Sequence, residues 1–92
     1  MKKSVKLTIT GSVQSLFFRT FIKENADINN VRGFLRKLED GRIEVFFEGN
    51  KEDVNEMITV CKNGPKHSII RNIDEKEMSF QDFKEFKILN FL

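Results

Sequence analysis

Two apolar periodicities alternate along this chain, and their alternation restricts the folds that it can adopt. Apolar residues recur at every second position in some segments and at helical spacing in others. The first pattern predicts a strand with one buried face, and the second predicts a helix with one apolar face. Because two such helices can bury their apolar faces only against a sheet, the sequence predicts a layered α+β fold.

The first half of the chain contains three predicted strands and one predicted helix. Val5, Leu7 and Ile9 alternate with polar residues, which is typical of a half-buried strand. Glu39-Asp40-Gly41 is a tight-turn signal, because glycine readily supplies a positive φ. The predicted order after the first strand is a loop at 11–17, a helix at about 18–28, a strand at 31–38, the turn, and a third strand through Ile43, Val45 and Phe47.

The second half begins with a predicted helix at about 51–62. Asn50 is a suitable N-cap residue, and Gly64-Pro65 is a typical helix stop. A fourth strand is expected at Ile69–Ile73, a polar loop at 74–82, and a last strand at 83–91.

The element order is therefore β-α-β-β-α-β with an extra C-terminal strand. The simplest solution is a ferredoxin-like, split β-α-β sandwich: a mostly antiparallel sheet with both helices on one face. Phe46 interrupts the alternation of its strand, so we expect both faces of that strand to be partly covered. With 92 residues and no internal repeat or linker, residues 1–92 are expected to form one domain.

Composition excludes several classes of protein. Hydrophobic residues make up 39% of the chain and charged residues 33%, which is typical of a folded globular domain. No apolar run approaches the roughly 18 residues that span a bilayer, and no signal segment is apparent, so we expect no membrane association and a cytoplasmic location. Cys61 and His67 are the only residues of their kinds, which argues against a metal site, and Cys61 is expected to be a small buried hydrophobe.

The segment from Gly11 to Arg19 carries the strongest functional signal. It connects a predicted strand to a predicted helix, and the backbone N–H groups at a helix start lack intrahelical partners. Arg19 adds a planar, permanently charged guanidinium that matches phosphate or carboxylate. The sequence therefore predicts a site for a small anion.

Several motifs of this chain resemble those of the acylphosphatase family. The family's first motif has the form G-x-V-Q-G-V-x-F-R, and residues 11–19 have the sequence GSVQSLFFR. A second family motif, roughly G-W-V-R-N-x-x-D-G-x-V-E-V followed by E-G, resembles GFLRKLEDGRIEV at 33–45 and Glu48-Gly49. Gly64-Pro65 and Phe86-Lys87-Ile88 resemble two shorter family motifs, so the resemblance covers essentially the whole chain.

The resemblance implies hydrolysis of acyl phosphates without a cofactor. It implies that Arg19 binds the phosphoryl oxygens, together with backbone N–H groups of the phosphate-binding loop formed by Val13, Gln14, Ser15, Leu16, Phe17 and Phe18. In the family, an asparagine on the second strand positions the attacking water. The partner implied is a small anionic ligand, phosphate or acyl phosphate.

Two positions depart from the family pattern. Lys37 stands where the family has the water-orienting asparagine, and a lysine ammonium has three donors but no acceptor. Ser15 stands where the family has glycine, which costs of order 1 kcal/mol if that position requires a positive φ. We therefore include Lys37 with Arg19 among the catalytic candidates and expect the anion site to persist while hydrolysis is impaired.

Two other functions remain open at this stage. One is a non-catalytic anion-binding or regulatory module of the same fold, because a fold does not determine a function. The other is RNA binding, since Arg32-Gly33-Phe34 resembles the start of an RNP1 motif. The residues that follow depart from RNP1, and the net charge of +2 comes with interspersed lysines and glutamates, so nucleic acid is the less favoured partner. A monomer is the expected oligomeric state.

Overall fold

Seven elements form in the order that the two periodicities predict. The computed structural model describes residues 1–12, 16–65 and 68–89. Its elements are β1 (Lys2–Ser12), α1 (Leu16–Ile28), β2 (Arg32–Lys37), β3 (Ile43–Asn50), α2 (Lys51–Asn63), β4 (Ile69–Glu77) and β5 (Phe86–Leu89).

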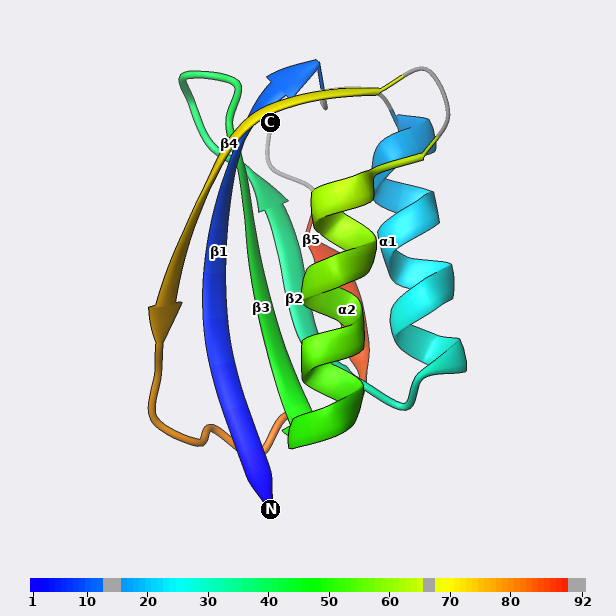
Figure 1. Ribbon diagram of the computed structural model, residues 1–92, viewed down its shortest axis with the longest axis vertical. Coiled ribbons are helices and arrows are strands. Elements are labelled where there is room, and N and C mark those ends of the chain that lie inside the picture. The colour runs from blue at the N-terminus through cyan, green and yellow to red at the C-terminus, as the bar shows by residue number, and fades with distance from the viewer. Residues whose placement is uncertain (13–15, 66–67, 90–92) are drawn as a thin grey trace.

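The strands form one sheet in the order β4-β1-β3-β2-β5. Neighbouring strands are antiparallel except β2 and β5, which are parallel. Both helices cover the same face of this sheet (Figure 1). Helix α2 contacts β1, β3 and β4, whereas α1 contacts β2 and β5. The predicted ferredoxin-like arrangement is confirmed.

The core lies between the helices and the sheet. Alternate residues of the strands point into it, as the period of two predicts, and the helices contribute residues at helical spacing. The buried side chains include Val5, Leu7, Ile9, Phe18, Ile22, Ala26, Leu35, Ile43, Val45, Phe47, Val54, Met57, Ile58 and Cys61. Burial also raises the pKa of the Cys61 thiol well above its usual range, which fits the expected role of Cys61 as a small hydrophobe.

Several predicted boundaries are wrong. Helix α1 begins at Leu16 and not at residue 18, so the loop expected at 11–17 is shorter. Strand β4 continues to Glu77 although 74–82 was expected to be a loop, and β5 covers only 86–89 of the strand expected at 83–91. Asn50 has the extended backbone of an N-cap, but its side chain makes no capping hydrogen bond.

The extension of β4 has a clear physical cause. Its residues 74–77 pair with β1 through backbone groups, with Val5 opposite Glu77 and Thr8 opposite Asp74. Their charged side chains stay exposed at the edge of the sheet. A polar edge strand buries little apolar surface, so its hydrophobic pattern is too weak to distinguish it from a loop.

The sheet face opposite the helices is partly covered by the segment 78–85, which connects β4 to β5. Phe83 of this segment makes edge-to-face contacts with Phe34 and Phe46, and only 4% of Phe46 is exposed. The expectation that both faces of β3 are partly covered is therefore confirmed.

Glu48 holds this covering segment in place. Its side chain is fully buried, and its carboxylate accepts hydrogen bonds from the Ser4 hydroxyl (2.9 Å), the Phe83 backbone N–H (2.9 Å) and the Gln81 backbone N–H. One side chain of β3 thus links β1 and the 78–85 segment, because a buried carboxylate requires donors and these are the donors that it finds.

Within the part of the chain that the structure describes, no helix is long and apolar enough to cross a membrane.

We expect Glu48→Gln to lower the free energy of unfolding by about 2 kcal/mol, because an amide replaces one acceptor oxygen with a donor that faces other donors. Urea unfolding followed by circular dichroism measures the change. The matched control is Glu77→Gln, an exposed position, where the expected change is within about 0.5 kcal/mol. Equal losses in the two variants would contradict the role assigned to Glu48.

Candidate functional site

Three chain segments meet at one end of the sheet. Strands β1 and β2 both pair antiparallel with β3, so they run parallel to each other and end at the same edge. The register places Ile9 of β1, Ile43 of β3 and Lys37 of β2 in one row across the sheet. Helix α1 begins shortly after β1 ends, at this same edge (Figure 1). The topology therefore brings the two catalytic candidates to one end of the molecule.

Gly11 shapes the approach to this end. The pairing of β1 with β4 shifts its register between Thr10 and Gly11, and Gly11 has a φ of 152°. A Cβ added to Gly11 would lie 2.0 Å from the carbonyl oxygen of Ile69, a distance that no side chain tolerates. Glycine is therefore required where β1 leaves its regular pairing and turns toward α1.

Arg19 lies in the first turns of α1. No acidic residue is present in the first turn of this helix, so the partial positive charge of its N-terminus has no side-chain counter-charge. The Arg19 Nε atom is buried and has no hydrogen-bond partner among the described residues. A guanidinium at the positive end of a helix, with an unsatisfied donor, is placed to attract an anion.

Lys37 is the last residue of β2, and its side chain is exposed. It alternates in step with Leu35, which is buried under the helices, and it stands opposite the buried Ile43. Lys37 therefore lies on the same sheet face as α1. Among the residues that the structure describes, Lys37 forms no ion pair. Its ammonium could therefore contact a bound anion.

The turn after Lys37 is structural, as expected. Asp40 accepts hydrogen bonds from the backbone N–H of Arg42 (3.0 Å) and from its Nε (2.7 Å). The backbone N–H of Arg42 is the main cause that lowers the pKa of Asp40. Gly41 supplies a φ of 93°. These contacts fit the expected role of Asp40 as a turn former.

The predicted phosphate-binding loop divides into two parts. Val13, Gln14 and Ser15 lie outside the described residues. The other three belong to the first turn of α1, where Phe18 is fully buried in the core. Phe17 is 63% exposed and Leu16 is 64% exposed. The helical spacing of Phe18, Ile22 and Ala26 agrees with this difference, because Phe17 lies off the face that they share.

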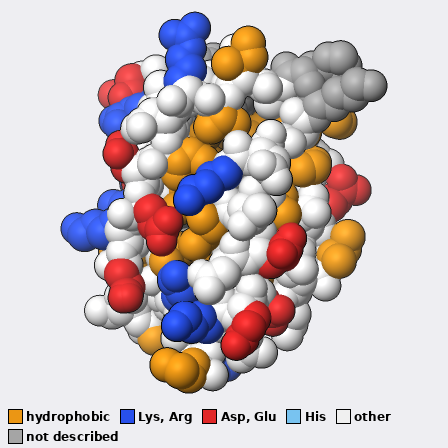
Figure 2. All heavy atoms as spheres, viewed as in Figure 1, with side chains coloured by type: hydrophobic (Ala, Val, Ile, Leu, Met, Phe, Trp, Pro, Cys, Tyr) orange, Lys and Arg blue, Asp and Glu red, His pale blue; other side chains and the backbone are white. Residues whose placement is uncertain are grey.

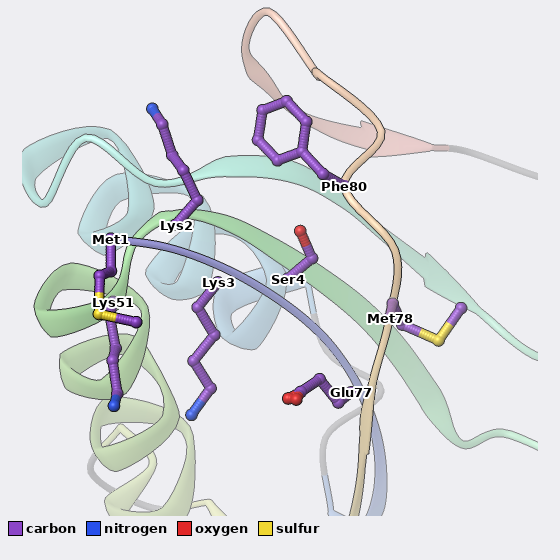
Figure 3. Close-up of a pocket in the computed structure, with 8 residues that line it drawn as sticks. All are labelled: Met1, Lys2, Lys3, Ser4, Lys51, Glu77, Met78 and Phe80. Atoms are coloured by element: carbon purple, nitrogen blue, oxygen red, sulfur yellow. The ribbon is translucent and has the colours of Figure 1, made fainter.

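A separate hollow of about 440 Å³ lies at the other end of the sheet, where β1 and α2 begin. The Lys2 ammonium lies 6.0 Å from the centroid of the Phe80 ring, and Figure 3 shows the side chains of Lys3 and Lys51 extending in the same direction. Lys3 donates a hydrogen bond to Asn55. Since β1 is 11 residues long, this hollow is roughly 30 Å from the start of α1 and is not part of the candidate site. Within the described chain, no cluster of three or more His, Cys, Asp or Glu residues could hold a metal ion.

Comparison with known proteins gives a consistent result. The acylphosphatase family model matches residues 5–88. An acylphosphatase of Syntrophus aciditrophicus is 38% identical over 90 residues, covering 97% of this chain and 94% of its own. One from Caldanaerobacter subterraneus is 34% identical over 89 residues, covering 96% and 99%. The crystal structure of acylphosphatase from Bacillus subtilis superposes with a TM-score of 0.90 at 27% identity, covering 98% of this chain and all of that one.

We expect Arg19→Gln to abolish the amide chemical-shift changes that inorganic phosphate produces at residues 16–19. The free energy of unfolding should stay within about 0.5 kcal/mol of the unmodified chain, because the Arg19 Nε has no described hydrogen bond to lose. NMR titration and urea unfolding measure the two quantities.

Arg36→Gln is the matched control and should behave in the opposite way. The Arg36 Nε lies 2.7 Å from the Glu44 carboxylate, so its loss should lower stability by up to about 1 kcal/mol while the phosphate response persists. An unchanged phosphate response in Arg19→Gln would rule out the proposed anion site.

Proposed function

The chain belongs to the acylphosphatase family, and we propose that it binds phosphate and acyl phosphates at the start of α1 but hydrolyses them slowly. The observation that carries this proposal is the placement of Arg19. Its Nε is buried without a described partner at a helix start that lacks acidic residues, and Lys37 is at the same end of the sheet. No metal or other cofactor is needed for this chemistry.

Acyl-phosphate hydrolysis needs few protein groups. Water attacks phosphorus, the bond from phosphorus to the bridging oxygen breaks, and its electron pair leaves with the carboxylate. The parent acid has a pKa of about 4–5, similar to Asp and Glu side chains, so the leaving group needs no general acid. Negative charge is spread over the phosphoryl oxygens in the transition state, and fixed donors such as Arg19 and helix N–H groups stabilise it.

Lys37 removes the hydrogen-bond acceptor that would orient the attacking water. An amide oxygen at this position could accept a hydrogen bond from water and orient its lone pair toward phosphorus. The ammonium of Lys37 can only donate, so it cannot orient water in this way, although its positive charge can attract the anion. Loss of one positioned polar group commonly costs about 10²–10³ in rate. Binding without efficient turnover is the expected result.

The placement of Arg19 at the start of α1 also supports one alternative function, a non-catalytic anion-binding module. Phosphate binding without any turnover would support it.

RNA binding is less favoured, because the aromatic rings on the open sheet face contact one another and Phe46 is buried. Figure 2 shows basic and acidic side chains interspersed over the face that it presents. A broad basic surface, the usual requirement for nucleic acid, is not seen there. The cytoplasmic location and the monomeric state stay predictions.

We expect Lys37→Asn to raise the rate of benzoyl phosphate hydrolysis by about 10-fold or more, because it supplies the missing acceptor. The ultraviolet absorbance of benzoyl phosphate reports the reaction. Ser15→Gly, added to Lys37→Asn, should raise the rate further if position 15 requires a positive φ.

Lys37→Met separates two explanations of that increase. It removes the ammonium without supplying an acceptor, so the rate should stay low if orientation of water is limiting. An equal increase in the methionine and asparagine variants would show that the positive charge itself inhibits. Family-like turnover by the unmodified chain would contradict the proposed effect of Lys37.

A further inference from the structure

Lys37 brings an amine without a carboxylate partner to the candidate site. It is exposed at the end of β2, and within the described chain it forms no ion pair, in contrast to Lys23 and Lys84. The ammonium form of a lysine can only donate hydrogen bonds, but a small fraction of any lysine amine is uncharged and carries a nitrogen lone pair. That lone pair makes an amine a nucleophile as well as a group that attracts anions.

The fold directs Lys37 and Arg19 toward the same space. Neighbouring strands are about 4.8 Å apart, so the Cα atom of Lys37 lies roughly 10 Å across the sheet from that of Ile9, near the end of β1. Lys37 is on the sheet face that the helices cover, and α1 contacts β2. Arg19 is three residues before the buried Ile22, so it lies on the flank of the helix surface that meets this face. Two long side chains can thus converge between the end of β2 and the first turns of α1.

We propose that acyl phosphates phosphorylate Lys37 itself, so that the chain transfers a phosphoryl group to its own side chain. This inference rests on the proposed function, since it assumes that Arg19 holds the phosphoryl group. The attacking and leaving atoms of a phosphoryl transfer lie on opposite sides of phosphorus. In the proposed function, the side chain at position 37 is on the side from which water attacks. The amine of Lys37 is therefore in line with the departing carboxylate.

The step is balanced without a cofactor. The uncharged Nζ atom of Lys37 forms a bond to phosphorus while the bond from phosphorus to the bridging oxygen breaks. The electron pair of that bond leaves with the carboxylate, and the nitrogen loses a proton to water. The products are a carboxylate and a phosphoramidate on Lys37. Arg19 stabilises the negative charge on the phosphoryl oxygens, as it does in the proposed hydrolysis.

An acyl phosphate offers a second electrophile, the carbonyl carbon. Attack there would give an N-acyl lysine and inorganic phosphate. That carbon is bonded to the bridging oxygen, so it lies beyond the leaving oxygen, on the side of phosphorus that faces away from an in-line nucleophile. The geometry of the proposed site therefore favours phosphorylation of Lys37 over acylation.

Other nucleophiles of the described chain are less suitable. The thiol of Cys61 is fully buried, and burial raises its pKa, so it supplies no accessible thiolate. Thr10 follows the buried Ile9 on β1, so its hydroxyl is on the sheet face opposite the helices.

Intact-mass spectrometry tests the proposal after incubation of the chain with acetyl phosphate and, separately, with benzoyl phosphate. We expect both donors to add the same mass, about 80 Da for one phosphoryl group. A mildly alkaline buffer without amines is used, because it raises the uncharged fraction of the amine and preserves a phosphoramidate. The added mass should disappear after mild acid treatment, and peptide mapping before that treatment should place it on Lys37.

Three variants separate the proposed step from general labelling of lysines. Lys37→Arg keeps a positive charge but has no uncharged form at this pH, so it should remove the added mass. Arg19→Gln should lower the phosphorylated fraction by about 10-fold or more, because the transition state loses a fixed donor. The matched control is Lys51→Met, which changes an exposed lysine at the other end of the sheet and should leave the phosphorylated fraction unchanged.

No added mass, masses that differ between the two donors, or an added mass that persists in Lys37→Arg would overturn the inference. Failure of the proposed function has a different signature, namely amide resonances at residues 16–19 that do not respond to inorganic phosphate. A phosphate response without an added mass therefore removes the inference alone, and the absence of both removes the anion site as well.

Discussion

The buried carboxylate of Glu48 is the contact that holds the segment 78–85 against the sheet. Strand β3 lies in the centre of the sheet, and seven of its eight residues are buried. The helices cover one face, and within the described part of the chain the segment 78–85 covers part of the other. That segment has two backbone N–H groups bound to Glu48 and one ring, Phe83, placed against Phe34 and Phe46. Glu48 therefore links the sheet to the segment that delivers β5 to its edge.

At the end of the sheet that carries Lys37, the charged side chains on the two faces differ in their pairing. Glu44 lies on the open face and is paired with Arg36 and, more distantly, with Lys6. Arg19 and Lys37 have no such partners within the described chain. Leu16 and Phe17 are exposed in the first turn of α1. Among the described residues, the Nε atoms of Arg19 and of Arg32 at the start of β2 are both buried without a hydrogen-bond partner, but only Arg19 is at the helix start that lacks acidic residues.

Membership of the family and the activity of this chain are separate questions. The fold depends on residues that are spread over the whole chain, and these remain compatible with the family. Under the proposed function, catalysis depends on a few polar groups, and Lys37 stands at one of the positions that the family resemblance implies. An exposed lysine at the end of β2 disturbs no core contact, so the fold tolerates it without cost. Its consequences are confined to the chemistry of the site.

The sequence by itself determined the elements whose signal is local. The apolar alternation of β1 and β3, the helical spacing in α1 and α2, and the Gly64 stop are all properties of neighbouring residues, and they predicted the order and the layers correctly. Tertiary structure alone decided the rest. The donors to Glu48 come from residues 33 to 44 positions away, and β4 is extended by pairing with β1. These features depend on which distant segment lies alongside, and periodicity within one segment contains no information about that.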